Sequence, residues 1–256
     1  MFRSWLALAV LCAGTARGAG PNYSAAGIVN ASNYAGGPFA PNSVISIFGS
    51  GMARSTHALT TSDIVSGRMP DELNYVRVYV QDQPVPLLFV SDGQINFIMP
   101  SVLNTGPVRI RVVAEGITGP EISVTLVDCA PALFALTDGY VIATSAAGKL
   151  LTADSPARAH DIVVVYATGL GRTSPNPGTF DIPNYAALIV AMPTLKVTLG
   201  GKPVDPMLIK YAGLTPGSAG LYQINIEIPD DTPSGAEITV AAGGSTPQTG
   251  LKLAVE

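Results

Sequence analysis

The sequence predicts an all-β protein made of two tandem immunoglobulin-like β-sandwiches. Only 12% of the residues are charged, and 27 glycines and 21 prolines interrupt the chain at frequent intervals. The apolar residues come in short alternating runs, which are typical of strands and not of helices. In addition, three sequence blocks occur twice in the same order, which indicates an internal duplication.

The repeated blocks fix the number of domains. The pairs are residues 43–52 with 161–170, 76–85 with 195–204, and 94–100 with 223–229. The offset between the copies is 118 residues in the first pair (Gly51 and Gly169), 119 in the second (Pro84 and Pro203) and 129 in the third (Gln94 and Gln223). The jump of about ten residues predicts an insertion in the second copy, which we expect in the loop at 213–220.

Each block reads as a strand with one apolar face, because successive side chains of a strand point to opposite faces. We expect the following residues in the two cores: Ile95, Phe97, Met99, Ile224, Ile226, Ile228, Val76, Val78 and Val80. Pro84, Pro86, Pro203 and Pro206 lack an amide donor, so we expect the returning strands to begin at a sheet edge or at a bend. Gly200 and Gly201 predict a hairpin turn.

The N-terminus resembles a secretory signal peptide over residues 1–18, with cleavage before Ala19. Residues 1–3 give a short basic start that ends in Arg3, residues 5–14 are apolar, and small residues occupy both recognition positions of the processing site. The apolar run is too short for a permanent membrane anchor, and Leu11 before Cys12 disfavours a lipoprotein. We therefore expect a secreted or extracytoplasmic protein with domains at 22–128 and 131–256 and a hinge at 128–131.

Cleavage would leave 12 Lys and Arg against 18 acidic residues, a formal charge of −6. A nucleic-acid partner is disfavoured, because no stretch supplies the basic stripe that phosphate binding needs. Cleavage also leaves Cys129 alone, so no intrachain disulfide forms, and we expect Cys129 to behave as a small buried apolar residue.

Residues 41–52, 88–100, 164–171 and 220–229 resemble the signature blocks of the Solibacter uncharacterised C-terminal domain family. The likeness runs from about Gly27 to Val255. It implies tandem TIG/IPT-like modules in a secreted or surface protein, usually behind a larger N-terminal region, and it implies no catalytic residues. Since such a region is missing here, the resemblance suggests a free-standing copy or the partner of another exported protein.

The residues of enzyme sites do not occur in the required patterns. His57 and His160 are not spaced as a metal-binding pair, and neither lies beside a cysteine. Ser50 lies in a Gly-Ser-Gly turn that lacks the surroundings of a nucleophile elbow. Asp230 and Asp231 form no complete calcium loop, although a weak calcium site was an open alternative to a solvated turn. We expect no catalytic residue, no metal site and no cofactor.

Immunoglobulin-like sandwiches present variable loops on rigid sheets, and the sequence shows no reaction centre, so we favour a non-catalytic protein–protein interaction or adhesion module at the cell surface or in the medium. A carbohydrate-binding module that accompanies an exported enzyme is the alternative. The expected mature chain has no Trp for stacking on sugars, but nine Tyr remain. A hydrolase with residues scattered over loops is the least favoured class.

Two sets of candidate binding residues follow. The first set recurs on polar strand faces: Gln94, Asn96, Gln223 and Asn225. Their amides either satisfy backbone groups in adjoining loops or between the domains, or they contact a ligand. The second set is Ile189, Val190 and Met192, in the uncharged segment 182–195. That segment either covers the edge of its own core or leaves these residues exposed to a protein partner.

Overall fold

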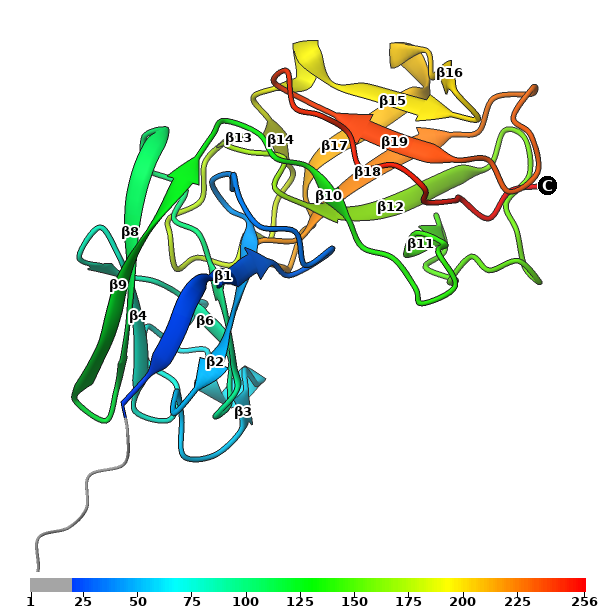
Figure 1. Cartoon of the computed structure of the whole chain (residues 1–256). Helices are drawn as coiled ribbons and strands as arrows, with labels where there is room; N and C mark the ends of the chain where they lie inside the picture. Colours follow the sequence, from blue (N-terminus) through cyan, green and yellow to red (C-terminus); the bar gives the residue numbers. More distant parts are fainter. Residues whose placement is uncertain (1–19) are drawn as a thin grey trace, which may run out of the picture.

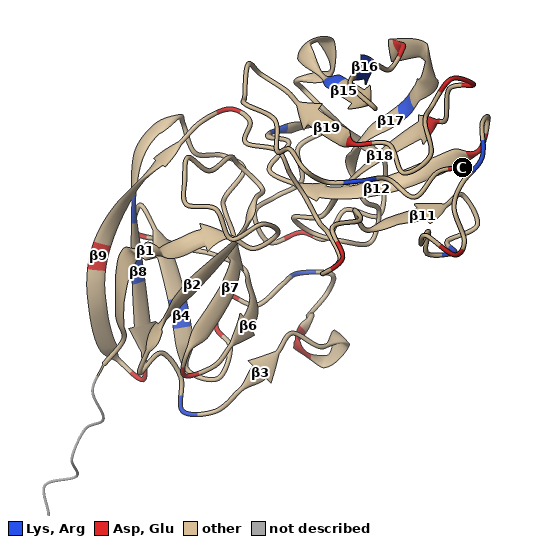
Figure 2. Ribbon diagram, turned by 45° about the vertical axis from the view of Figure 1, so that its right-hand side comes forward, with Lys and Arg blue, Asp and Glu red and all other residues tan. Residues whose placement is uncertain are grey.

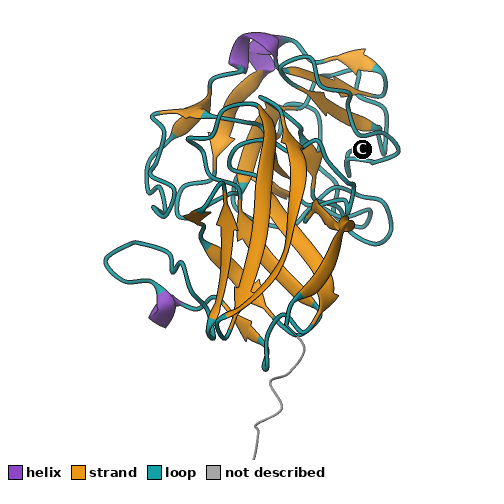
Figure 3. Ribbon diagram, turned by 60° about the vertical axis from the view of Figure 1, so that its left-hand side comes forward, coloured by secondary structure: helices purple, strands orange, loops and turns teal. Residues whose placement is uncertain are grey.

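The computed structural model describes residues 20–256, and these form two β-sandwiches that follow one another along the chain (Figure 1). Within this range the only helical elements are three single turns of 3-10 helix (Figure 3). The predicted fold class, all-β with tandem immunoglobulin-like sandwiches, is confirmed. The predicted signal peptide lies outside the described residues. No helix within residues 20–256 has the length and apolarity needed to cross a membrane.

The first sandwich packs a five-stranded sheet, in the order β1-β2-β7-β6-β3, against a four-stranded sheet, in the order β5-β4-β8-β9. Its elements are β1 (Asn22–Asn30), β2 (Val44–Ser50), β3 (His57–Ala58), η1 (Thr61–Asp63), β4 (Val76–Val80), β5 (Gln83–Pro84), β6 (Leu87–Val90), β7 (Gln94–Ile98), β8 (Gly106–Ala114) and β9 (Ile117–Leu126).

The second sandwich has a larger sheet in the order β10-β12-β18-β17-β14-β13, with β11 paired to β12, and a three-stranded sheet in the order β16-β15-β19. Its elements are β10 (Ala132–Leu133), β11 (Ala143–Ser145), β12 (Ile162–Thr168), β13 (Thr173–Ser174), β14 (Ala187–Ile189), η2 (Met192–Thr194), β15 (Lys196–Leu199), β16 (Lys202–Pro203), η3 (Pro206–Leu208), β17 (Ile209–Leu214), β18 (Tyr222–Glu227) and β19 (Ile238–Ala241).

Each sandwich has its own hydrophobic core. One cluster of buried side chains runs from Tyr23 to Leu126 and the other from Cys129 to Val255. All nine residues predicted to lie in the cores are at most 1% exposed. Burial of this apolar surface is the main source of stability in both halves.

The hairpin turns and proline positions follow the prediction. Gly200 and Gly201, both with positive φ, form the two-residue turn between β15 and β16. Gln81 and Asp82 adopt the same left-handed conformation in the first copy, with φ of 50° and 62°. Pro84 and Pro203 lie in β5 and β16, the edge strands of the two smaller sheets, where a missing amide donor breaks no ladder.

The insertion in the second copy is divided between two places. Strand register makes Leu87 equivalent to Ile209, since these residues pair with Phe97 and Ile226 at matching positions. The offset between copies is therefore 119 residues at Pro84, 122 at Leu87 and 129 at Gln94. The increase in offset between Pro84 and Leu87 falls where the second copy has the turn η3. The increase between Leu87 and Gln94 lengthens the loop between β17 and β18. The prediction of a single insertion at 213–220 was incomplete, because Gly213 and Leu214 belong to β17.

Hydrogen bonds between distant segments join the two sandwiches. The backbone amide of Val44 donates to Thr168 Oγ1 at 2.9 Å, and Ser32 Oγ donates to the carbonyl of Leu133 at 2.6 Å. Gly220 lies so close to Val44 and Ile98 that a Cβ at this position would come within 2.9 Å of the Val44 side chain. The outer face of the five-stranded sheet therefore abuts the second sandwich at this end.

The long loops of the two copies also contact each other. The backbone amide of Met69 donates to the carbonyl of Phe180 at 2.8 Å. Arg68 lies 3.3 Å from a carboxylate oxygen of Asp181, and its guanidinium lies 5.5 Å from the centre of the Phe180 ring. Together with the bonds to Thr168 and Leu133, these contacts fix the second sandwich against the first.

Candidate functional site

The polar amides predicted as binding residues lie on the outer faces of the two large sheets. Gln94 and Asn96 are half-buried in β7, and they alternate with Ile95 and Phe97, which are fully buried. Gln223 and Asn225 occupy the same positions in β18. Each pair therefore faces away from its own core.

In the first sandwich the two amides bond to each other. Asn96 Oδ1 accepts a hydrogen bond from Gln94 Nε2 at 2.8 Å and another from Ser46 Oγ at 2.9 Å. Aromatic residues stand on both sides, because Phe48 of β2 pairs with Gln94 and Phe89 of β6 pairs with Asn96. We name Phe48, Gln94, Asn96 and Phe89 the first amide–aromatic strip.

The second sandwich repeats this arrangement. Gln223 Nε2 donates to Asn225 Oδ1 at 3.1 Å. Tyr166 of β12 pairs with Gln223, and Tyr211 of β17 pairs with Asn225. These four residues form the second amide–aromatic strip, in which both rings are half-buried.

The ring of Tyr211 lies across the neighbouring glycine of its strand. A Cβ on Gly213 would come within 2.6 Å of the Tyr211 hydroxyl. That hydroxyl donates to the carbonyl of Leu214 at 2.6 Å and accepts from the backbone amide of Ala187 at 3.3 Å. The absence of a side chain at position 213 therefore lets the ring fold onto the sheet.

The two strips correspond position by position. Tyr166 follows Phe48 by 118 residues, Tyr211 follows Phe89 by 122, and both amides recur after 129. Sequence reasoning found the amides and missed the aromatic residues. Phe48 and Tyr166 occupy the same place in the first repeated block, which was the available signal. The equivalence of Phe89 and Tyr211 could not be seen in the sequence, because the first part of the insertion precedes them and changes the offset between the copies to 122 residues.

One expected role of the amides was wrong. One of the two alternatives from the sequence is that they satisfy backbone groups in adjoining loops or between the domains. The structure instead gives Asn96 and Asn225 side-chain partners on their own sheet. An outward strand position directs an amide along the sheet face, where the nearest polar group is two residues away on the same strand.

The first strip continues into a pair of exposed rings. Tyr34 is 64% exposed and Phe48 is 37% exposed. Their ring centres lie 6.0 Å apart with an angle of 50° between the ring planes. This separation falls within the range of favourable aromatic contacts, so the two rings support one another at the protein surface.

The second set of candidate residues contains one buried, one half-buried and one exposed side chain. Ile189 is only 2% exposed, so the expectation that it faces solvent was wrong. It lies in β14 and pairs with Thr173, and its side chain packs in the core of the second sandwich. Met192 is half-buried against the same core. Val190, the next residue after β14, is 62% exposed.

The histidines and aspartates singled out in the sequence lie close to oppositely charged or hydrogen-bonding side chains. His57 Nε2 lies 3.0 Å from Asp63, and hydrogen bonds from Thr60 and His57 lower the pKa of Asp63 to about 2. His160 lies 2.7 Å from Asp230, and Lys202 lies 2.6 Å from Asp231. Within residues 20–256 no three His, Cys, Asp or Glu side chains gather closely enough to hold a metal ion.

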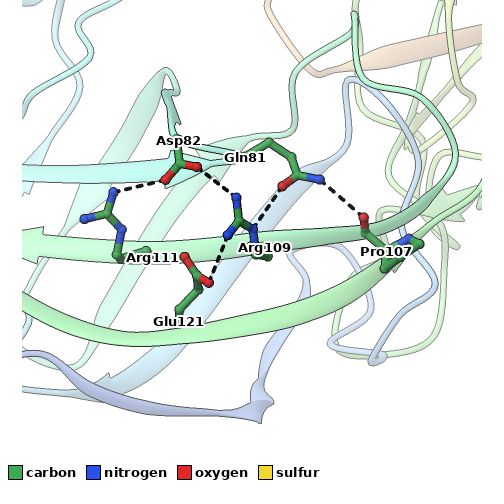
Figure 4. A network of polar contacts seen from close by, with 6 residues as sticks. All are labelled: Gln81, Asp82, Pro107, Arg109, Arg111 and Glu121. Carbon is green, nitrogen blue, oxygen red and sulfur yellow. Dashed lines mark hydrogen bonds and ion pairs between the residues drawn. The ribbon is translucent and has the colours of Figure 1, made fainter.

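Charged side chains are paired on the smaller sheet of the first sandwich. Arg109 reaches Asp82 at 2.9 Å and Glu121 at 3.4 Å, while Arg111 reaches Asp82 at 3.4 Å (Figure 4). Figure 2 shows Lys and Arg interspersed with Asp and Glu over both sandwiches. Most of the Lys and Arg residues in the described range thus lie beside a carboxylate.

A cleft of about 630 Å³ lies where the two sandwiches meet. Its walls come from the loop after β1, the linker between the domains and the glycine-rich loop at 243–246. Among residues 20–256, Asp128 is the only charged residue that lines it, and it lies 3.2 Å from Arg172. The cleft has the size of a small-molecule pocket, but no group in it indicates a particular ligand.

Comparison with solved structures finds distant likenesses over nearly the whole chain. A surface glycan-binding protein from Prevotella bryantii is 13% identical, with 90% of this chain and 41% of that chain covered and a TM-score of 0.27. A Bacteroides ovatus glucan-utilisation SGBP-B, solved with a mixed-linkage heptasaccharide, is 11% identical over 92% and 46% of the chains, with a TM-score of 0.32. Domains 5–6 of the S-layer protein SbsC are 12% identical over 92% and 99%, with a TM-score of 0.27.

This chain spans less than half the length of each of the two glycan-binding structures. At these scores the likeness does not extend to individual residues or ligands. No protein-family model and no curated protein matches the sequence.

Proposed function

We propose that this is an exported, non-catalytic binding protein that holds a ligand of the cell surface or medium on the outer faces of its two large sheets. The observation that carries the proposal is the amide–aromatic strip, which occurs at equivalent positions in both sandwiches. Both amides and both aromatic positions are retained although the second copy carries extra residues before β17 and before β18.

The reactive residues support a role without catalysis. Each histidine contacts carboxylates, and within residues 20–256 no hydroxyl or thiol is hydrogen-bonded to either imidazole. Cys129 is buried, and burial together with the nearby Asp128 raises the pKa of its thiol to about 11, so very little thiolate forms at neutral pH. Loops carried on a rigid sandwich are a common framework for binding proteins.

Export is part of the same proposal and rests on the pattern of residues 1–18. The resemblance to the Solibacter C-terminal domain family agrees with it. Two classes of ligand fit an exported module of this kind: another exported protein and a neutral glycan.

Co-sedimentation of the purified protein with the envelope fraction of its source cells tests the proposed function. We expect the protein to sediment with untreated envelopes. Protease treatment of the envelopes removes a protein ligand, and periodate treatment removes a glycan ligand. A protein that stays in the supernatant and binds nothing in the spent medium is not a binding protein of this kind.

A further inference from the structure

We infer that the first amide–aromatic strip, extended by Tyr34, is a binding site for a neutral glycan chain. The inference rests on the proposed function, since it names the ligand class of the same surface. Four observations carry it: the exposed rings, the orientation of the amides, the lack of charge on the face, and the placement of polar and apolar groups across it.

The rings provide surfaces on which a sugar can stack. Phe48 and Tyr34 form an exposed pair at one end of the strip, and Phe89 stands at the other end. Two strand spacings and two residues separate Phe48 from Phe89, which amounts to about 12 Å between their Cα atoms. Successive sugar units of an extended chain could therefore meet a ring at each end, with amides between them.

The amides provide hydrogen-bonding groups of the kind that sugar hydroxyls need. Asn96 Oδ1 is occupied by Ser46 and Gln94, so the group that Asn96 offers to a ligand is its Nδ2 donor. Gln94 uses Nε2 for this internal bond, so its Oε1 is the acceptor that it offers. A hydroxyl group both donates and accepts, and it can therefore bond to this donor and acceptor together.

The face is electrically neutral. The five strands of this sheet, β1, β2, β3, β6 and β7, contain no Asp, Glu, Lys or Arg. The arginines of the first sandwich's strands, Arg77, Arg109 and Arg111, belong to the opposite sheet. A charged ligand would find no counter-charge on this face, whereas a neutral one needs none.

The placement of polar and apolar groups favours a glycan over a protein. Protein interfaces generally have an apolar centre and a polar rim. This strip has the reverse order, with Ser46, Asn96 and Gln94 in the centre and aromatic rings at both ends. A protein partner would bury the two half-buried amides at the centre of its contact, beside Ser46, which is already only 1% exposed.

The first strip is the better site of the two. Phe48 is exposed, whereas Tyr166 and Tyr211 are half-buried. The hydroxyl of Tyr211 is already engaged by Leu214 and Ala187. The strands of the second strip also carry charged residues. Lys210 of β17 and Glu227 of β18 lie 2.8 Å apart.

The test is a screen of the purified protein against an array of neutral and acidic glycans, followed by calorimetric titration with the best neutral oligosaccharide. We expect binding to neutral glycans only. Replacement of Phe48 or Tyr34 by Ala should weaken binding about fivefold each. Asn96→Asp keeps the Oδ1 acceptor but removes the Nδ2 donor, and it should weaken binding by a similar factor.

Tyr75→Ala is a matched control for Tyr34→Ala. Both tyrosines belong to the first sandwich and have positive φ, 56° and 62°, and Tyr75 is 71% exposed on a different surface. Thermal melting of every variant separates lost binding from lost folding. The inference is overturned if no neutral glycan binds, if the strip variants bind like Tyr75→Ala, or if protease and not periodate abolishes binding to envelopes. That last result would leave the proposed binding function standing with a protein as its ligand.

Discussion

Thr168 of the second sandwich accepts a hydrogen bond from the backbone amide of Val44 in the first, at 2.9 Å, across 124 residues of sequence. Its hydroxyl also donates to the carbonyl of Gly220 at 3.0 Å, and its side chain is fully buried. One hydroxyl thus satisfies two backbone groups at the junction, where water has little access.

We expect Thr168→Val to destabilise the protein by about 2–4 kcal/mol, because it leaves a part-buried amide and a buried carbonyl without this partner. Thr239→Val is a suitable control, since it removes a half-buried side-chain bond to Thr198 at 2.7 Å away from the junction. That loss should cost about 1 kcal/mol. Urea unfolding measures the free energy of unfolding of both variants. An equal loss of stability in the two would contradict a special role for Thr168.

The two strip asparagines should differ in their contribution to stability. Asn96 Oδ1 accepts two hydrogen bonds and Asn225 Oδ1 accepts one. Each bond contributes about 1 kcal/mol, so Asn96→Ala should lower the melting temperature by more degrees than Asn225→Ala. Differential scanning calorimetry gives the comparison. A melting temperature that is unchanged in Asn225→Ala would mean that its amide serves ligand contact alone.

Ile189 and Val190 give a matched pair of substitutions at adjacent positions. Ile189→Asp places an unpaired carboxylate in the core and should cost several kcal/mol, enough to unfold the second sandwich. Val190→Asp, at a residue that is 62% exposed, should change stability by less than about 0.5 kcal/mol. Circular dichroism melts would show it. A folded Ile189→Asp variant would mean that β14 is not packed as described.

Cys129 should make stability depend on pH above about 9. The unfolded thiol ionises near its ordinary pKa of 9.0, whereas burial and then Asp128 raise the folded pKa to about 11. The folded state therefore holds its proton longer, and its stability falls as the pH rises through this window. Urea unfolding at pH 8 and pH 10 should show a larger loss for the wild type than for Cys129→Ser. Equal losses of stability in the two proteins would mean that a group other than Cys129 titrates in this pH range.

The sequence predicted the parts of the fold that depend on local periodicity. Alternation in Gln94–Ile98 identified both the buried face and the outward amides, because period-two burial is visible in five residues. Alternation in β14 was not visible, because that strand has three residues inside an uncharged run. The partners of the amides depended on register, and a β-bulge between Leu87 and Phe89 shifts that register by one residue.

The junction could not be predicted for a different reason. Val44 and Thr168 belong to repeated blocks and look like ordinary strand residues in the sequence. Their contact depends on the rotation of one sandwich relative to the other, which no local pattern records. The same holds for the approach of Arg68 to Asp181 in the two long loops.

The rigid junction has a consequence for affinity. If the two sandwiches were joined by a free linker, the second strip would sample many positions once the first had bound, and its effective concentration would be spread over all of them. Here Thr168, the Ser32–Leu133 contact and the Met69–Phe180 contact hold the strips at one separation. A long polymer with a repeat that matches this separation would engage both strips and gain avidity, while a short oligomer would bind each strip independently.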